Sequence, residues 1–469
     1  SLNGEELGTV TWDNQEVKIF DNSRKNNGLL KNDNTITLYL PGDLPNVSYD
    51  RVLLNWIKLE CTAALQAVND SLRFEIGKQS RRPILASRFS EDRLYILSED
   101  GQQIIPDRVR ANRGTYEVLF ASESMNSRSF YIVANKKLAR VNSITLDAPS
   151  NLASQSNGAD YIIITHAKFM EQARTLAQFR TSQGFRTMVV DVQDVYDEFN
   201  AGVYDPNAIH TFLEYAYHNY KKPAPLYILL FGDTTHYMDK RRAYQLNYTS
   251  YVPTLMSYTT SWGMTSSDNG FVTVSGDDIL PDMYIGRFPV NTTEEADILV
   301  HKTIEYESQP VISDWRRNVI MVTGNAQQFE TDADELFEEY MPRRCVTNRL
   351  ATMTSSRYFG STEDLAAAWN NGQVIINFVG HGGGQVFEDS RLFLLEDVNR
   401  LKNKDKYSIM FSLTCFIGYF DNPEKASLSE ELLRRDDLGI VAHFGSAGRA
   451  SMLGDHYLEI GRASCRERV

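Results

Sequence analysis

The first third of the chain carries short runs in which apolar and polar residues alternate. The runs lie at residues 35–40, 51–59, 94–97, 116–120 and 129–133, and Asn, Gly, Asp and Ser separate them. Alternation puts every second side chain on one face of a strand, and closely spaced short strands are typical of a β-sandwich. We predict an all-β sandwich of roughly seven or more strands over residues 1–150.

The spacing of apolar residues changes after a polar segment at residues 147–158, which contains Pro149 and Gly158 and is typical of a linker. Beyond it, continuous apolar runs such as 161–165 and 226–231 alternate with helical patterns such as 169–183. This alternation predicts parallel sheets covered by helices on both faces. Because single cores stop growing near about 250 to 300 residues, we predict two α/β subdomains in series, at 158–310 and 311–458.

The same patterns predict the elements of the second half. We expect strands at 282–288, 319–323, 374–379, 408–414 and 439–444, and helices at 294–307, 332–340, 362–370 and 427–434. Residues 459–469 resemble a translated sequencing adapter, and we treat them as a non-native tail. We expect the second subdomain to be truncated in this sequence and the chain to begin within a longer protein.

Charge and cysteine content limit the classes of partner and of site that this chain can have. The 61 acidic and 48 basic residues give a formal charge of −13, which disfavours nucleic acid as a partner. No run approaches the roughly 20 apolar residues of a membrane span. Of the four cysteines, Cys465 lies in the tail, and Cys61, Cys345 and Cys415 are too few for a disulfide framework. One of the three is therefore a candidate for reactivity.

Two predicted strands run directly into residues that can carry chemistry. The strand at 374–379 leads into Gly380 and His381, and the strand at 408–414 leads into Cys415. Carboxyl ends of neighbouring parallel strands share one edge, so an imidazole and a thiol would meet there as base and nucleophile. The alternatives stay open, because a cysteine at a strand end is often a packing residue and glycine-rich loops also bind phosphate.

Two motifs and their order carry a family resemblance. NFVGHGG at 377–383 and TCFIGYFD at 414–421, with GADYIIITH at 158–166, LLFGD at 229–233, IGRF at 285–288 and SLSE at 427–430, resemble blocks of the gingipain-like cysteine peptidases of family C25 over residues 158–455. The resemblance implies a caspase-like fold and hydrolysis of peptide bonds through an acyl-enzyme on Cys415. It implies His381 as the base, which then protonates the leaving amine, and the N–H groups of Gly382 and Cys415 as the oxyanion hole.

One position departs from the family pattern. Arginine-specific gingipains carry a carboxylate, which supports the histidine, after the strand that corresponds to 319–323, whereas this chain has Gly324 and Asn325. Either Asn325 or a backbone carbonyl would orient the imidazole, and we assign no third catalytic residue. By resemblance, Glu330 or Asp332 would bind a basic P1 side chain. Acids in the first turn of a helix are equally expected for dipole reasons.

The resemblance also bears on cofactors, partners and location. Catalysis requires no cofactor, but a structural Ca²⁺ ion is possible because Asp268, Asp277, Asp278 and Asp282 supply oxygen ligands. We expect a secreted or bacterial cell-surface endopeptidase acting on proteins or peptides. The alternatives are a type IX secretion sortase-like peptidase that cleaves C-terminal sorting domains, and a non-catalytic surface or secretion scaffold on the same fold.

Overall fold

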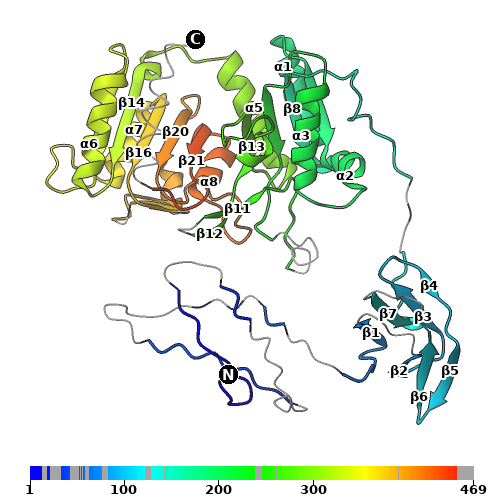
Figure 1. Cartoon of the computed structure of the whole chain (residues 1–469). Helices are drawn as coiled ribbons and strands as arrows, with labels where there is room; N and C mark the ends of the chain where they lie inside the picture. The colour runs from blue at the N-terminus through cyan, green and yellow to red at the C-terminus, as the bar shows by residue number, and fades with distance from the viewer. Residues whose placement is uncertain are drawn as a thin grey trace. The chain divides into compact units, whose positions relative to one another are not determined.

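The computed structural model describes residues 1–12, 18–21, 33–42, 52, 54, 56–58, 63–76, 83–121, 128–141, 144, 146–237, 246–259, 262–388 and 390–451. The chain divides into two compact units, which are coloured along the sequence in Figure 1. One unit comprises residues 1–8 and 24–148, and the other comprises 149–469 together with 9–23.

The first unit contains two antiparallel sheets that enclose one core. One sheet has the order β1 (Ser71–Ile76), β7 (Arg128–Ala134), β3 (Leu94–Ser98) and β4 (Gln103–Ile104). The other has the order β2 (Ile84–Phe89), β6 (Thr115–Phe120) and β5 (Arg108–Asn112). Alternate side chains of both sheets are buried together, among them Phe89, Ile96, Phe120, Phe130 and Ile132. The predicted sandwich strands at 94–97, 116–120 and 129–133 are confirmed.

The strands predicted at 35–40 and 51–59 are not confirmed. Residues 35–40 form no ladder strand, since the described part of this segment has one isolated bridge, from Leu2 to Ile36. Its apolar side chains are exposed, including Tyr39, so alternation alone did not create a sheet face here. The predicted strand at 51–59 lies partly outside the described residues.

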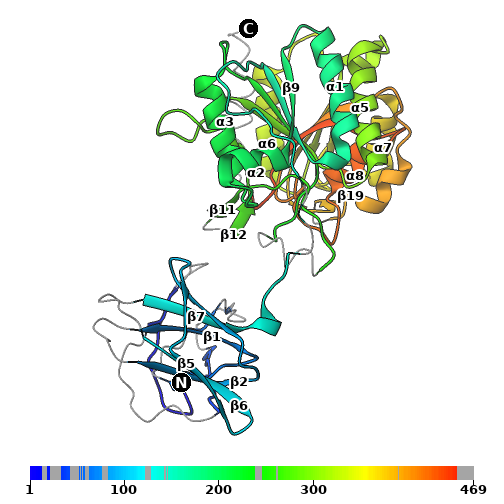
Figure 2. The same cartoon turned by 90° about the vertical axis from the view of Figure 1, so that its right-hand side faces the viewer.

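The second unit begins with a parallel sheet of order β13 (Tyr284–Phe288), β10 (Tyr227–Phe231), β8 (Tyr161–Thr165) and β9 (Thr187–Asp191). Helices α1 (Met170–Ser182) and α5 (Thr293–Ser308) pack in one core against it. Helices α2 (Val192–Asn200) and α3 (Asn207–Asn219) pack in a second core. Figure 2 shows these helices on opposite sides of the strands. A hairpin of β11 (Met256–Thr259) and β12 (Gly263–Ser266) precedes β13.

A five-stranded parallel sheet follows, with the order β15 (Val346–Ala351), β14 (Asn318–Thr323), β16 (Ile375–Val379), β20 (Ser408–Leu413) and β21 (Ile440–Gly445). Helices α7 (Thr362–Asn371) and α8 (Leu428–Arg434) share one core with it, and α6 (Gln327–Glu335) lies over other residues of β14. Three two-residue strands form a small antiparallel sheet: β17 (Gly382–Gly383), β18 (Val386–Phe387) and β19 (Phe393–Leu394). The predicted parallel α/β architecture is confirmed.

Two details of this half were predicted wrongly or missed. The helix expected at 332–340 begins earlier, at Gln327, and continues as a π-helical turn, η5 (Leu336–Tyr340). Strand β15 was not predicted, because Thr, Asn and Arg interrupt its apolar pattern at the sheet edge. Among the residues that the structure describes, the remaining short helices are 3₁₀ turns: η1 (Asn135–Lys137), η2 (Ala167–Phe169), η3 (Asp268–Phe271), η4 (Asp314–Arg317) and η6 (Leu395–Arg400).

Two buried basic side chains join the two parallel sheets. Arg434 of α8 donates to Asp233, which follows β10, and to Glu430, each at 2.8 Å. Lys302 of α5 donates to the carbonyl of Leu433 in α8 at 2.9 Å and to that of Leu438, just before β21, at 3.2 Å. Because a buried polar or charged group is costly without partners, these bonds fix one sheet against the other and so fix the loops between them.

Candidate active site

The two chemistry-bearing loops leave adjacent strands at the same sheet edge. β16 and β20 are parallel neighbours, with Val379 opposite Leu413. The register continues one residue further, where the Gly380 N–H lies 3.5 Å from the Leu413 carbonyl. His381 and Cys415 therefore begin the two loops side by side, as the strand pattern predicted.

Gly382 shows how closely the loops approach. A Cβ atom at Gly382 would lie 2.6 Å from Thr414 Oγ1 and 2.9 Å from the Cys415 carbonyl oxygen. Real Cβ atoms essentially never come so near. Only a glycine fits here, and its backbone therefore lies directly against Thr414 and Cys415.

Cys415 lies at a sharp turn that is hydrogen bonded to the loop after β21. Phe416 has a φ of 63°, a left-handed conformation that is unfavourable for a bulky residue and that turns the chain away after the thiol. The Phe416 N–H donates to the Gly448 carbonyl at 2.9 Å, and Cys415 Sγ donates to the Ala450 carbonyl at 3.7 Å. The Phe416 ring packs edge-to-face on Trp262, with centroids 4.7 Å apart. The thiol is half-buried.

His381 is exposed and is positioned by an aromatic ring. Its imidazole packs edge-to-face on Phe329, with centroids 5.3 Å apart and an interplanar angle of 84°. Phe329 is itself buried in α6 against Val379 and Leu413, the last residues of β16 and β20. The helix after β14 thus places one aromatic wall beside the imidazole, at the edge from which the thiol also emerges.

His443 offers no competing base. It hydrogen bonds with Ser412 Oγ at 2.6 Å, and burial lowers the pKa of His443 to about 3. The imidazole is therefore neutral across the physiological range and is bound to a residue of the neighbouring strand β20.

Comparison with known proteins shows the family of this chain. The model of peptidase family C25 matches residues 154–460, well over half of the sequence. The chain belongs to peptidase family C25. Lys-gingipain W83 from Porphyromonas gingivalis is 22% identical over 309 residues, which are 64% of this chain and 16% of that protein. Gingipain R2 from the same species is 22% identical over 266 residues, which are 55% of this chain and 32% of that protein.

Solved structures show the same fold. The crystal structure of the Arg-specific cysteine proteinase gingipain R aligns with a TM-score of 0.54 at 18% identity, covering 67% of this chain and 68% of that one. A complex of the pro- and mature domains of RgpB from P. gingivalis aligns with a TM-score of 0.53 at 20% identity, covering 65% and 67%. The predicted gingipain-like, caspase-like α/β fold preceded by a β-rich region is confirmed. The chain spans less than a third of the length of the two curated gingipains.

The other predicted site residues of this C25 chain lie on or before α6. Asn325 is exposed, and in the part of the chain that the structure describes it makes no hydrogen bond to His381. Glu330 is half-buried, and its Oε1 atom has no hydrogen-bond partner among the described residues. The carboxylate of Asp332 is buried and accepts a bond from Gln328 Nε2 at 2.7 Å.

Glu388 was not predicted as a site residue, although it follows His381 by only one short hairpin. Its side chain is 2% exposed, and its Oε2 atom accepts the His381 backbone N–H at 3.3 Å. The Glu388 N–H in turn donates to the His381 carbonyl at 2.8 Å. A carboxylate in a glycine-rich histidine loop was the available signal, but sequence spacing does not show that a hairpin folds it back.

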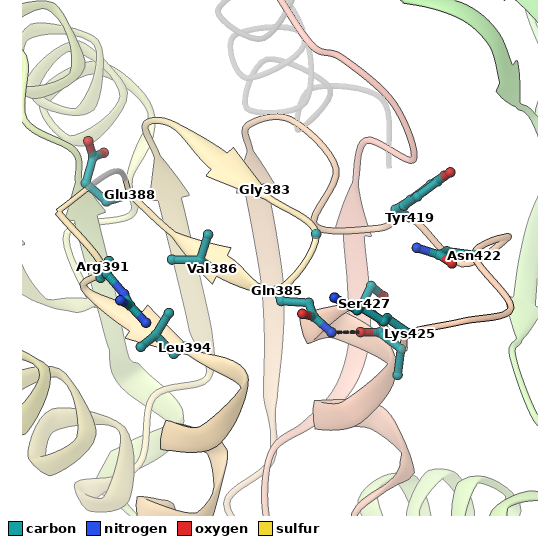
Figure 3. Close-up of a pocket in the computed structure, with 12 residues that line it drawn as sticks. Gly383, Gln385, Val386, Glu388, Arg391, Leu394, Tyr419, Asn422, Lys425 and Ser427 are labelled. Carbon is teal, nitrogen blue, oxygen red and sulfur yellow. Dashed lines mark hydrogen bonds between the residues drawn. The ribbon is translucent and has the colours of Figure 1, made fainter.

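A pocket of about 550 Å³ borders both loops. Its lining comes from the hairpin after His381 and from the segment after Cys415, including Gly384, Gln385, Tyr419 and Lys425. Figure 3 shows Gln385 reaching across to this second segment, where Gln385 Nε2 donates to the Ala426 carbonyl at 3.1 Å. The Glu388 carboxylate points away from the middle of the pocket in the same view.

Three of the four acidic residues predicted as calcium ligands have separate partners. Asp268 pairs with Arg287, with Oδ2 2.7 Å from Nε, and Asp282 Oδ2 accepts the N–H groups of Val274 and Ser275 at 2.8 Å. Asp278 accepts the Leu280 N–H. The calcium site stays a prediction. No helix among the described residues is both long enough and apolar enough to span a membrane.

Proposed function

We propose that this chain is a cysteine endopeptidase that hydrolyses peptide bonds of protein or peptide substrates through an acyl-enzyme on Cys415. The observation that supports this most directly is the close approach of Gly382 to Thr414 and Cys415, which joins the histidine and cysteine loops at one sheet edge. Membership in peptidase family C25 supports the same reaction class.

The proposed chemistry assigns each group a proton or an electron pair. His381 accepts the thiol proton of Cys415, and the thiolate attacks the substrate carbonyl carbon. The N–H groups of Gly382 and Cys415 stabilise the oxyanion of the tetrahedral intermediate. The His381 imidazolium then protonates the leaving amine, and a water deprotonated by His381 releases the acyl group from sulfur.

The test compares hydrolysis of a fluorogenic peptide library by wild type, Cys415→Ala and His381→Ala. Each variant should lose at least about 10³-fold in kcat. Cys345→Ala is the matched control, because Cys345 packs against a separate cluster that includes Val319 and Met321, and its removal should leave kcat unchanged. A folded wild type without Cys415-dependent hydrolysis would instead support the non-catalytic scaffold.

Two finer assignments belong to the same proposal. Glu330 is the better candidate for a basic P1 side chain, because its Oε1 atom has no hydrogen-bond partner among the described residues, while Asp332 is bonded to Gln328. Glu330→Gln should then reduce kcat/KM for Arg or Lys at P1 but not for Gln. Transfer of the acyl group to an added amine, rather than to water, would identify the sortase-like alternative. We propose a secreted or bacterial cell-surface location, in line with the family.

A further inference from the structure

The segment from His381 to Glu388 is a closed hairpin. Gly382 pairs with Phe387 and Gly383 with Val386, and the Glu388 N–H closes the ring on the His381 carbonyl. The turn is held from outside, since the Leu428 N–H donates to the Gly384 carbonyl at 2.7 Å. Glu388 has a φ of 67°, an unfavourable value for a residue other than glycine. The backbone strain is thus at Glu388, whose side chain leaves the hairpin toward Gly324 and Gly380.

The Glu388 carboxylate occupies a slot formed by two glycines. A Cβ atom on Gly324, at the end of β14, would collide with Glu388 Oε2, and one on Gly380 would lie 2.8 Å from it. The slot thus reaches from the end of β14 to the end of β16, next to the backbone N–H of His381. Any side chain at 324 or 380 would expel the carboxylate.

The cost of this arrangement points to a role for the charge. Glu388 is 2% exposed, and among the described residues its carboxylate is bonded by the His381 backbone N–H alone. A buried carboxylate with one neutral donor is expensive unless a positive charge forms nearby. When His381 accepts the thiol proton, its imidazolium becomes such a charge, and it lies on the same residue whose backbone N–H the carboxylate binds.

We propose that Glu388 is a positioning residue for His381: its buried carboxylate holds the histidine backbone and stabilises the imidazolium that forms during the reaction. This role rests on the proposed function. Among the described residues, the other titratable or charged groups at this edge include Cys415 after β20, Glu330 and Asp332 on α6, and Arg391 in the turn after β18. Glu388 is distinguished from Glu330 and Asp332 by its bond to the histidine itself.

The experiment measures kcat and kcat/KM from pH 5 to 9 for wild type, Glu388→Gln, Glu388→Asp and Gly324→Ala. If the carboxylate stabilises the imidazolium, the alkaline limb of kcat/KM should move to lower pH in Glu388→Gln. The rate at the optimum should fall by about 10- to 100-fold, mainly in kcat. Glu388→Asp should retain most of the wild-type pH profile, because it keeps the charge.

Two further variants separate this role from a structural one. Gly324→Ala keeps the glutamate in the sequence but puts a methyl group where the Glu388 carboxylate lies, so the carboxylate must move. It should shift the alkaline limb of kcat/KM in the same direction as Glu388→Gln. Asp397→Asn is the matched control, because Asp397 is also buried but bonds Arg400 and the Leu394 N–H. It should lower the melting temperature and leave the pH profile unchanged.

The outcomes distinguish the two claims. If wild type shows Cys415-dependent hydrolysis and the Glu388→Gln and Gly324→Ala profiles overlay that of wild type, the role of Glu388 is wrong and the proposed function stands. If Glu388→Gln fails to fold, an unshifted Gly324→Ala profile still overturns the role. If wild type shows no Cys415-dependent hydrolysis, both claims fail together.

Discussion

Replacing Gly382 by alanine tests the site geometry at its tightest point. The added methyl carbon would lie 2.6 Å from Thr414 Oγ1 and 2.9 Å from both Thr414 Cγ2 and the Cys415 carbonyl oxygen. Rotating the Thr414 side chain cannot relieve the contact, because Thr414 is buried and presents both Oγ1 and Cγ2 to the added methyl group. The Cys415 carbonyl oxygen belongs to the backbone and cannot turn aside either. The histidine loop must therefore move away from the cysteine loop.

The size of that movement sets the expected loss. Ordinary contacts begin near 3.4 Å, and 3.4 − 2.6 gives a displacement of about 0.8 Å. A misplacement near 1 Å at a reacting centre costs about 100-fold in rate, or about 2.7 kcal/mol in the activation free energy. Overpacking should also lower the free energy of unfolding by about 1 to 3 kcal/mol.

Gly383→Ala is the matched control, one residue along the same hairpin. Its Cβ atom would meet Val386 Cγ1 at 3.7 Å, an ordinary contact. The assay is kcat/KM on a fluorogenic peptide at 25 °C, with a thermal melt of each variant. We expect a loss of about 100-fold for Gly382→Ala and less than about threefold for Gly383→Ala. Equal activities of the two variants would refute the close approach of the loops.

Two further predictions concern the contacts between the parallel sheets. Arg434→Met leaves Asp233 and Glu430 buried without their cation, so the free energy of unfolding, measured by urea titration near neutral pH, should fall by about 3 to 5 kcal/mol; a loss below about 1 kcal/mol would contradict this pairing. Burial lowers the pKa of Lys302 to about 7, so between pH 7 and 10 the unfolded chain holds a proton that the folded chain releases, and stability should rise with pH. In Lys302→Met that rise should be smaller, and parallel stability–pH curves for the two proteins would contradict the lowered pKa.

The strands and the candidate pair could be predicted from sequence because each depends on local pattern. Continuous apolar runs ending in His381 and Cys415 fixed both the strand type and the edge at which the loops emerge. The segment at 35–40 shows the limit, because alternation describes a possible face and not whether another element covers it. Strand β15 shows the reverse, since its polar residues lie at an edge where burial is incomplete.

Glu388 and Phe329 could not be predicted because their roles depend on tertiary contacts. The Glu388 carboxylate reaches the histidine backbone through a hairpin that closes on itself, and the slot exists because Gly324 of another strand has no side chain. Phe329 meets the imidazole only after α6 has packed on the ends of β16 and β20. Spacing along the chain encodes neither contact.

The rate of alkylation at Cys415 tests the central claim most directly. A thiol activated by His381 is alkylated as its thiolate, whereas Cys345 packs in a hydrophobic cluster. With limiting iodoacetamide at pH 6 to 7 and mass-spectrometric mapping, wild type should label first at Cys415, and His381→Ala should remove that preference. Labelling at Cys415 that is equal to or slower than labelling at Cys345 and Cys61 would contradict the peptidase assignment.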